Sequence, residues 1–391
     1  MAEQLRNPQG RRSFIGLAAA AGLSLVLASC AGGPAPRQPT QPTQPTTEIV
    51  PNLPPDETRN RVAVLVPMTG PNAGVGQSIA NAANLALLDS GGQKIRITIY
   101  DTAKAGALAA ANEALADGSG LFLGPLLAED AKAVAAVARR ARVPVIAFSN
   151  DTSVAGNGVY LMGFTPEQSI ERVVEYARGR GIGRFGALVP RGVYGQRASA
   201  AVIAAVEHNG GRMVGMQEYD RSAAGLKAAI AQLQSQGSFD AILIADSGRS
   251  AASAATLVRA SPSKSARILG TELWAAESDL PQLASLHGAW FASASDTMFD
   301  KLRSSYRARY GRAPFRLAGL GYDAVALAVR IAGDWPIGRA FPQRALLDPG
   351  GFAGVDGAFR FTRNGVAERA LQVQQVDATG LTVVSAAPKG F

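Results

Sequence analysis

The chain has 391 residues, 47% of them hydrophobic, which is enough for roughly two or three domains of about 100–200 residues with buried cores. Its net charge of +9 comes from scattered basic residues, and only 6% of the residues are aromatic, so the sequence offers no basic stripe or stacking platform for nucleic acid. A single cysteine and two histidines exclude a disulfide framework and a zinc site of cysteine and histidine ligands. We therefore expect a globular protein without a metal, a cofactor or a nucleic-acid partner.

Residues 1–29 have the pattern of an export signal. Arg11 and Arg12 precede an apolar run from Phe14 to Leu27, which is followed by Ala28-Ser29-Cys30. This run has about fourteen residues, whereas a helix that spans a bilayer needs about twenty. The arginine pair resembles a twin-arginine signal, and Leu27-Ala28-Ser29-Cys30 resembles the lipobox of bacterial lipoproteins.

This resemblance implies that Cys30 is lipidated and becomes the mature N-terminus, which would anchor the protein to a membrane. Ala31 after Cys30 favours the outer membrane, again by resemblance to other lipoproteins. The alternative is an ordinary secretion signal with a chance cysteine. Residues 30–60 are rich in Pro, Thr and Gln, and we expect an extended tether that could reach about 90 Å at about 3.1 Å per residue.

From residue 61 onward, short apolar runs alternate with segments of helical spacing. The first series predicts strands at 61–67, 95–100, 121–123 and 145–148 and helices at 78–88, 105–116 and 129–141. The second predicts strands at 185–189, 212–218, 241–245 and 267–269 and helices at 166–178, 196–209, 226–234 and 250–259. The predicted fold class is α/β with two doubly wound parallel-sheet lobes, whose function would lie at the carboxyl ends of the strands.

Several motifs carry a family resemblance. The run Val62–Pro71, with Gly74 and Gly76-Gln77-Ser78 after it, resembles the opening of type I periplasmic binding proteins of the branched-chain amino acid receptor kind. The resemblance continues to the C-terminus through four further runs, Val143–Asn150, Val193–Gln196, Phe239–Ile242 and Gly321–Ala324. Within that superfamily, Gly124–Leu127 and Leu188–Arg191 resemble penicillin-binding-protein activators, which are outer-membrane lipoproteins that stimulate peptidoglycan synthases.

The resemblance implies a hinge of three strands between the lobes, with crossings near Phe164, Gly288 and Leu346. The N-terminal lobe would then comprise 61–163 plus 289–345, and the C-terminal lobe 164–288 plus 346–391. Strands 357–361 and 370–376 would end the C-terminal lobe. Such a hinge permits closure on a ligand.

The expected cleft differs from that of an amino-acid receptor. In those receptors the loop after the third strand is rich in Ser and Thr, whereas here it reads Gly124-Pro125-Leu126-Leu127-Ala128-Glu129. Hydroxyl groups are missing, Pro125 has no N–H, and Glu129 would repel a carboxylate. We interpret Leu126, Leu127 and Glu129 as a candidate docking loop instead.

Other polar and aromatic residues remain candidates for contact with a ligand or a partner. They are Ser149, Asn150, Arg191, Tyr194, Asp246, Ser247, Glu272 and Trp274. Glu272 falls close to where the receptors place the carboxylate that pairs with the ligand ammonium. The other interpretation is that these residues are helix caps, turn residues and contacts between lobes.

Two enzyme motifs occur in the sequence, but neither has the sequence context that its chemistry requires. Gly181–Gly186 fits G-x-G-x-x-G but precedes a strand, and Ser261–Lys264 fits S-x-x-K without the accompanying motifs of penicillin-binding enzymes. We therefore expect no catalytic residues.

Two functions remain. The first is a non-enzymatic envelope lipoprotein that regulates peptidoglycan synthases through exposed loop residues, which include Arg191, Tyr194, Trp274 and Phe291. The alternative is a solute receptor that delivers amino acids or related molecules to an ABC permease. The best-known activators carry a helical-repeat domain before this module, and here only the proline-rich tether precedes it.

Overall fold

The computed structural model describes residues 56–388 and residue 390. The expected signal, Cys30 and most of the tether lie outside the described residues. All described residues belong to one compact unit, Ile49–Phe391. Among the described helices, none is both long enough and apolar enough to cross a membrane.

The first lobe is built on a parallel sheet of five strands in the order β2-β1-β3-β4-β5. Its strands are β1 (Asn60–Val66), β2 (Ile95–Asp101), β3 (Leu121–Leu123), β4 (Val145–Ala147) and β5 (Val159–Leu161). Five consecutive residues of β1, from Val62 onward, are fully buried. Such an unbroken apolar run is typical of a parallel strand that is covered on both faces.

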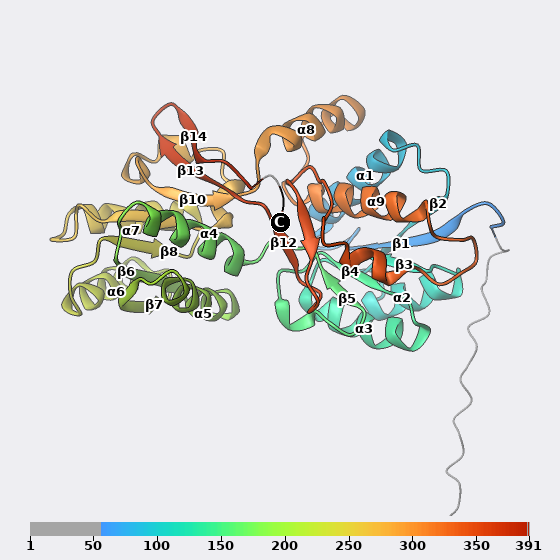
Figure 1. Ribbon diagram of the computed structural model, residues 1–391, viewed down its shortest axis with the longest axis horizontal. Coiled ribbons are helices and arrows are strands. Elements are labelled where there is room, and N and C mark those ends of the chain that lie inside the picture. Colours follow the sequence, from blue (N-terminus) through green and yellow to red (C-terminus); the bar gives the residue numbers. More distant parts are fainter. Residues whose placement is uncertain (1–55, 389, 391) are drawn as a thin grey trace, which may run out of the picture. The chain divides into compact units, whose positions relative to one another are not determined.

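Helices cover both faces of this sheet. One face is covered by α2 (Ala107–Ala116) and α3 (Ala128–Ala141), the other by α1 (Ala73–Asp89) and α9 (Ala318–Ala332). In Figure 1, α9 in orange lies beside α1 in blue although the two are far apart in sequence. Helix α8 (Asp296–Tyr310) also packs against α1.

The second lobe contains a mixed sheet of seven strands in the order β14-β13-β10-β9-β8-β6-β7. The parallel strands are β6 (Arg184–Pro190), β7 (Arg212–Tyr219), β8 (Ala241–Ile244), β9 (Arg267–Gly270) and β10 (Trp290–Ser293). Two antiparallel strands, β13 (Gln372–Asp377) and β14 (Gly380–Ser385), extend it (Figure 1).

Four helices pack on this second sheet: α4 (Pro166–Gly179), α5 (Val193–His208), α6 (Ala223–Ser235) and α7 (Gly248–Arg259). Short 3-10 turns, η2 (Glu272–Ala276), η3 (Leu280–Gln282) and η4 (Ala284–Leu286), connect β9 to β10. The prediction of an α/β protein with two lobes is confirmed.

Two of the expected crossings between lobes differ from the observed ones. Strand β10 pairs with β9 and β13, so the chain leaves the second sheet after Ser293 and not near Gly288. The reason is that Phe291 and its neighbours are apolar and complete the core of the second lobe.

The last crossing is also later than expected. Strands β11 (Phe359–Phe361) and β12 (Ala367–Arg369) form a separate hairpin, whose aromatic residues pack into the core of the first lobe. The Leu161 N–H donates to the Gly365 carbonyl at 2.7 Å and ties this hairpin to β5. The chain therefore crosses after Arg369 and not near Leu346.

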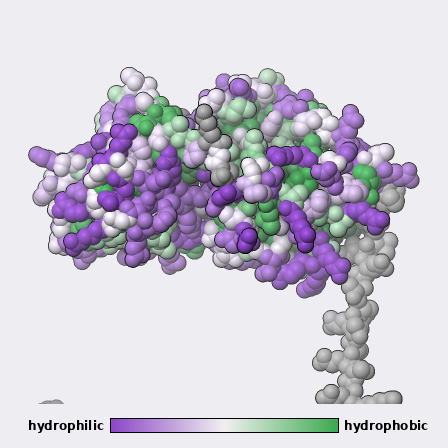
Figure 2. All heavy atoms as spheres, in the orientation of Figure 1, coloured by the Kyte–Doolittle hydropathy of each residue, from purple (hydrophilic) through white to green (hydrophobic). Residues whose placement is uncertain are grey.

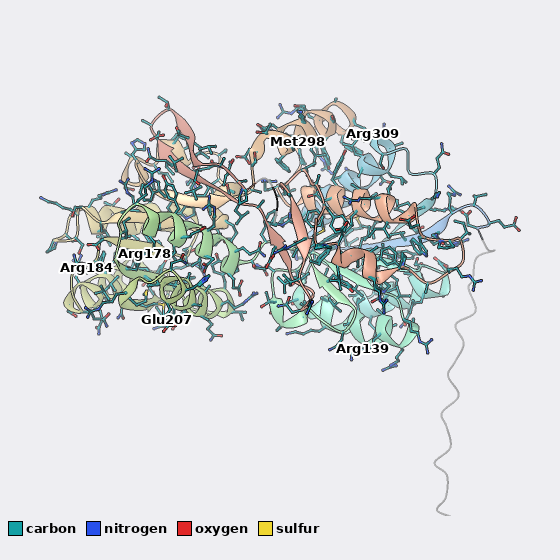
Figure 3. The ribbon with its side chains drawn as sticks, viewed as in Figure 1. Arg139, Arg178, Arg184, Glu207, Met298 and Arg309 are labelled. Atoms are coloured by element: carbon teal, nitrogen blue, oxygen red, sulfur yellow. The ribbon has the colours of Figure 1, made fainter. Side chains whose placement is uncertain are left out.

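Most of the visible face carries hydrophilic residues, with hydrophobic residues in small groups (Figure 2). Charged side chains such as Arg184 and Glu207 on the second lobe and Arg139 and Arg309 on the first extend from the ribbon (Figure 3).

Candidate functional site

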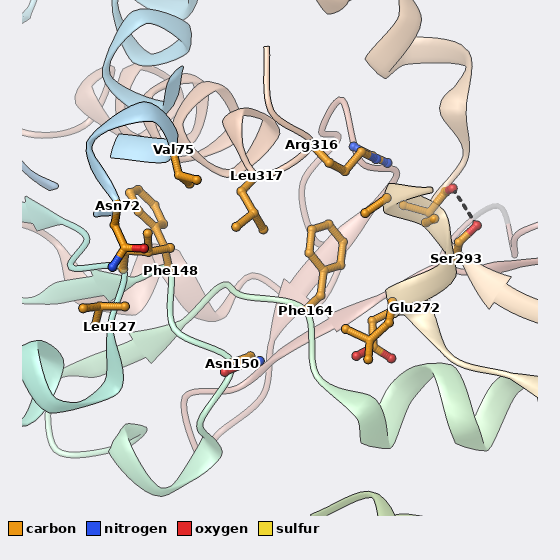
Figure 4. Close-up of a pocket in the computed structure, with 15 residues that line it drawn as sticks. Asn72, Val75, Leu127, Phe148, Asn150, Phe164, Glu272, Ser293, Arg316 and Leu317 are labelled. Carbon is orange, nitrogen blue, oxygen red and sulfur yellow. Dashed lines mark hydrogen bonds between the residues drawn. The ribbon is translucent and has the colours of Figure 1, made fainter. Parts of the chain in front are cut away.

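A pocket of about 460 Å³ lies where the carboxyl ends of strands from both sheets meet (Figure 4). The first lobe contributes the loops after β1, β3 and β4 and the segment before α9, and the second contributes η2 and the end of β10. The lining residues are Asn72, Val75, Leu126, Leu127, Phe148, Asn150, Phe164, Arg316 and Leu317, together with Glu272, Leu273, Ala275, Ala276, Ser293 and Ala294. This is the position at which doubly wound folds place their ligands.

The loop after β3 presents apolar side chains to this pocket. Leu126 and Leu127 are half-buried and line it, whereas Glu129 is exposed and is not among the lining residues. Leu127 occupies the N-cap position of α3 and makes no side-chain cap. Glu129 and Asp130 stand in the first turn of this helix, so carboxylates of the protein already complement its positive end.

The carboxylate of Glu272 is engaged by hydroxyl groups of its own lobe. The Ser169 hydroxyl donates to its Oε2, and the Tyr194 hydroxyl donates to Oε1 at 3.0 Å. Thr271 Oγ1 also lies 3.0 Å from the Tyr194 hydroxyl. Burial raises the pKa of Glu272, and the hydrogen bonds from Ser169 and Tyr194 only partly offset that effect. The carboxylate is thus less available as a counter-charge for a ligand ammonium.

Arg316 is the other charged residue that lines the pocket, and it is neutralised by the protein. Its Nη1 pairs with Asp356, its Nη2 lies 3.7 Å from Asp296, and its guanidinium lies 4.0 Å from the centre of the Phe299 ring. The hydroxyl of Ser293 is also engaged, because it accepts from Gln374 at 3.0 Å.

Two carboxamides at the pocket have no partner within the described part of the chain. Asn72 precedes α1 without forming a side-chain cap, and the Asn150 side chain makes no hydrogen bond to residues 56–388. Both residues are exposed and belong to the first lobe. Asn150 is also a point of contact between the lobes, because Arg197 of α5 donates to its carbonyl and, at 2.9 Å, to Thr152 Oγ1.

The structure brings together only some of the candidates from the sequence. Asn150, Glu272, Leu126 and Leu127 line the pocket, and Tyr194 supports it by holding Glu272.

The other candidates have structural partners. Ser149 is buried and accepts from the Asp151 N–H at 3.1 Å, and Ser247 caps α7 by accepting from the Ser250 N–H at 3.2 Å. Asp246 is 3% exposed and accepts from the Tyr219 hydroxyl at 2.7 Å.

Two aromatic residues and one arginine do not line the pocket. Trp274 is fully buried and donates from its indole nitrogen to the Asp246 carbonyl at 3.0 Å. Phe291 is also fully buried, with its ring 5.6 Å from that of Trp274. Neither residue can be a surface anchor. Arg191 is exposed and does not line the pocket.

Sequence reasoning missed several lining residues, notably Asn72, Val75, Phe148, Arg316 and Leu317. Phe148 ends a predicted strand, and its position after β4 is a signal that could have indicated the pocket. Arg316 and Leu317 lie in a segment between two helices that carries no motif.

The model of the periplasmic binding protein family matches residues 60–381, so the chain belongs to this family. Members of this family and fold are typically non-enzymatic, and membership suggests a periplasmic location. The prediction of a type I periplasmic binding protein-like fold is confirmed.

Solved structures of two functional kinds share this fold. The leucine binding protein LivK from Thermotoga maritima has a TM-score of 0.60 at 19% identity, over 84% of this chain and 98% of that one. A solute binding protein of an ABC transporter from Rhodopseudomonas palustris, in complex with 3,4-dihydroxybenzoic acid, has a TM-score of 0.65 at 20% identity, over 86% and 98%. The LpoA C-domain from Haemophilus influenzae, a regulator of PBP1A, has a TM-score of 0.64 at 18% identity, over 83% and 100%.

At these identities the likeness shows the fold alone. A curated sequence, the uncharacterised protein RP748 from Rickettsia prowazekii, is 29% identical over 139 residues. That match covers 35% of this chain and only 37% of the Rickettsia protein.

Proposed function

We propose that the chain is a non-enzymatic envelope lipoprotein that regulates a peptidoglycan synthase through protein contact. The observation that carries this proposal is the loop after β3, where Leu126 and Leu127 stand in place of hydroxyl-bearing residues. An amino-acid carboxylate would find no hydroxyl donor in this loop and would face the acidic first turn of α3.

The contact surface is proposed at the tip between β6 and α5. Arg191 is exposed, and Val193 is 66% exposed although it is apolar. Gly192 between them has a φ of 110°, a backbone conformation that favours glycine and projects its neighbours from a tight turn. An arginine beside an exposed apolar residue on a rigid scaffold is a suitable protein contact. Tyr194, the next residue along the chain, donates its hydroxyl to Glu272 and so holds the start of α5 beside this tip.

Co-purification tests this surface. The double variant Arg191→Glu with Val193→Asp should lose a class A penicillin-binding synthase that the full chain retains, because it reverses the charge and removes the apolar contact. Lys227→Glu on α6, an exposed charge reversal in the same lobe, is the matched control and should retain the partner. Equal recovery of the synthase by a folded double variant would refute the proposed surface.

A solute receptor of an ABC transporter is the second candidate, and the pocket itself favours it. A cavity of about 460 Å³ lies within the range of about 300–1,000 Å³ that is typical of small-molecule sites. Solute uptake through an ABC permease that depends on this chain would distinguish a solute receptor from a regulator of a synthase.

A further inference from the structure

The walls of the pocket are mostly apolar. Ten of its lining residues have apolar side chains, contributed by both lobes: Val75, Leu126, Leu127, Phe148, Phe164, Leu273, Ala275, Ala276, Ala294 and Leu317. Figure 4 shows Leu317, Phe164 and Val75 around the same space. A ligand that removes these side chains from water gains about 25 cal/mol for each Å² of apolar surface buried. The apolar walls therefore favour a ligand with an apolar body.

The two titratable residues at the pocket are already engaged by the protein, Arg316 by carboxylates and Glu272 by hydroxyl groups, and burial raises the pKa of Glu272 and so favours its uncharged form. Both oxygens of Glu272 accept from hydroxyl groups, and Arg316 is paired with Asp356 and lies near Asp296. Among the described residues that line the pocket, the unpartnered charged donor is Arg316 Nε, which is buried, so a charged ligand would lose its hydration for little gain, which is costly in an apolar site. The site therefore selects against carboxylates, ammonium groups and zwitterions.

Neutral hydrogen-bonding groups are available at the first-lobe side. Asn72 and Asn150 each offer an amide N–H₂ and a carbonyl oxygen, and neither side chain is bonded within the described residues. A hydroxyl or an amide on the ligand would match these groups without carrying a charge.

From this arrangement we propose that the pocket binds an uncharged molecule with an aromatic or alicyclic body and a neutral polar substituent that hydrogen-bonds Asn72 or Asn150. This ligand class differs from the zwitterionic amino acids. The inference goes beyond synthase regulation and does not depend on it, because the tip at Arg191 and Val193 does not line the pocket.

The first test uses N-phenyl-1-naphthylamine, an uncharged fluorescent amine, with the full chain. Its fluorescence should rise and saturate at one molecule per chain. Leu127→Glu places an unpaired carboxylate in the wall and should weaken binding at least about tenfold, which is about 1.4 kcal/mol. Leu108→Glu on α2, at a side chain that is 48% exposed and away from the pocket, should bind like the unmodified chain.

Charge selection is tested by a matched pair of competitors. The neutral 2-naphthamide should displace the probe, whereas 2-naphthoate and leucine should not.

Three results would each overturn the inference: no saturable binding of the probe, unchanged binding by Leu127→Glu, or displacement by leucine or 2-naphthoate in preference to 2-naphthamide. If Leu127→Glu does not fold, Asn150→Asp at an exposed position of the rim takes its place and should also weaken binding. Failure of the regulatory proposal is recognised separately, by retention of the synthase in the Arg191 and Val193 variant.

Discussion

Asp323 on α9 is a fully enclosed carboxylate behind the pocket. It is 1% exposed, and its Oδ1 accepts from the Val355 N–H at 2.7 Å. Asp356, which pairs with Arg316, is also fully buried. Arg369 is 7% exposed, and its guanidinium lies 4.6 Å from the centre of the Phe164 ring, which lines the pocket. This cluster connects the pocket wall to the last crossing between the lobes.

The titration of Asp323 gives a pH-dependent stability. Burial and the neighbouring Asp356 raise its pKa to about 7, with Arg369 acting in the opposite direction. Because the folded pKa lies above the unfolded value of about 3.9, the folded state binds the proton more tightly, and stability falls as pH rises between about 4 and 7.

Asp323→Asn should remove much of this dependence, and the variant should gain stability relative to the unmodified chain as pH rises from 5 to 8, by up to about 3 kcal/mol. Urea unfolding at both pH values measures the effect. Asp334→Asn, at an exposed carboxylate, is the control and should follow the unmodified chain. A slope that Asp323→Asn leaves unaltered would assign the pH dependence to other groups.

At this same scale, the sequence predicted some site residues and missed others for identifiable reasons. Asn150 and Glu272 follow predicted strands, and the structure places both at the pocket, as strand ends are expected to be. The sequence predicts Trp274 as a loop residue that contacts a ligand or a partner. In the structure the Trp274 indole packs over Gly270, where a Cβ would lie 2.3 Å from the ring. Such a contact depends on the three-dimensional fold and cannot be predicted from the sequence pattern.

Helices α1 and α5 each contain a glycine that lets the helix approach the end of the strand before it. Gly76 in α1 and Gly195 in α5 each stand against the carbonyl oxygen of the proline that ends or follows the strand. A Cβ would lie 1.8 Å from the Pro67 oxygen at the first position and 1.6 Å from the Pro190 oxygen at the second. Glycine at these positions permits the close approach that positions the strand-end loops.

Gly195→Ala should therefore destabilise the second lobe by at least about 1–3 kcal/mol, because backbone must move to accept the methyl group. The urea midpoint of the full chain measures this loss. Gly179→Ala is the matched control, since a Cβ there meets nothing within 4 Å and alanine favours a helix by about 0.8–1.0 kcal/mol. A Gly195→Ala variant as stable as the control would contradict the close packing.

The predicted alternation of strands and helices agrees with the observed elements from β1 to β9 except for β5 (Val159–Leu161), which was not predicted, because long buried apolar runs and helical spacing are strong local signals and β5 has only three residues. The boundaries of the lobes were placed less well. Strands β10, β11 and β12 have only three or four residues each, and which core they join depends on contacts distant in sequence.

At the scale of the whole molecule, the proposed lipid anchor determines where the protein acts. Cys30→Ala should accumulate as precursor or as unanchored protein, because the lipid attachment site is removed. Membrane fractionation and the mass of the mature N-terminus measure this outcome. Unaltered processing and unaltered membrane association would support the alternative of an ordinary secretion signal.

At this scale, the central proposal is that the protein regulates a peptidoglycan synthase and that its pocket offers no hydroxyl-lined site for an amino-acid carboxylate. The most direct test is the rate of glycan polymerisation by a purified class A penicillin-binding synthase from the same organism, with increasing amounts of the full chain. We expect the rate to change and to saturate as the chain is added, and we expect Arg191→Glu with Val193→Asp to reduce this effect while Lys227→Glu does not. A rate that the unmodified chain leaves unchanged at every concentration would contradict it.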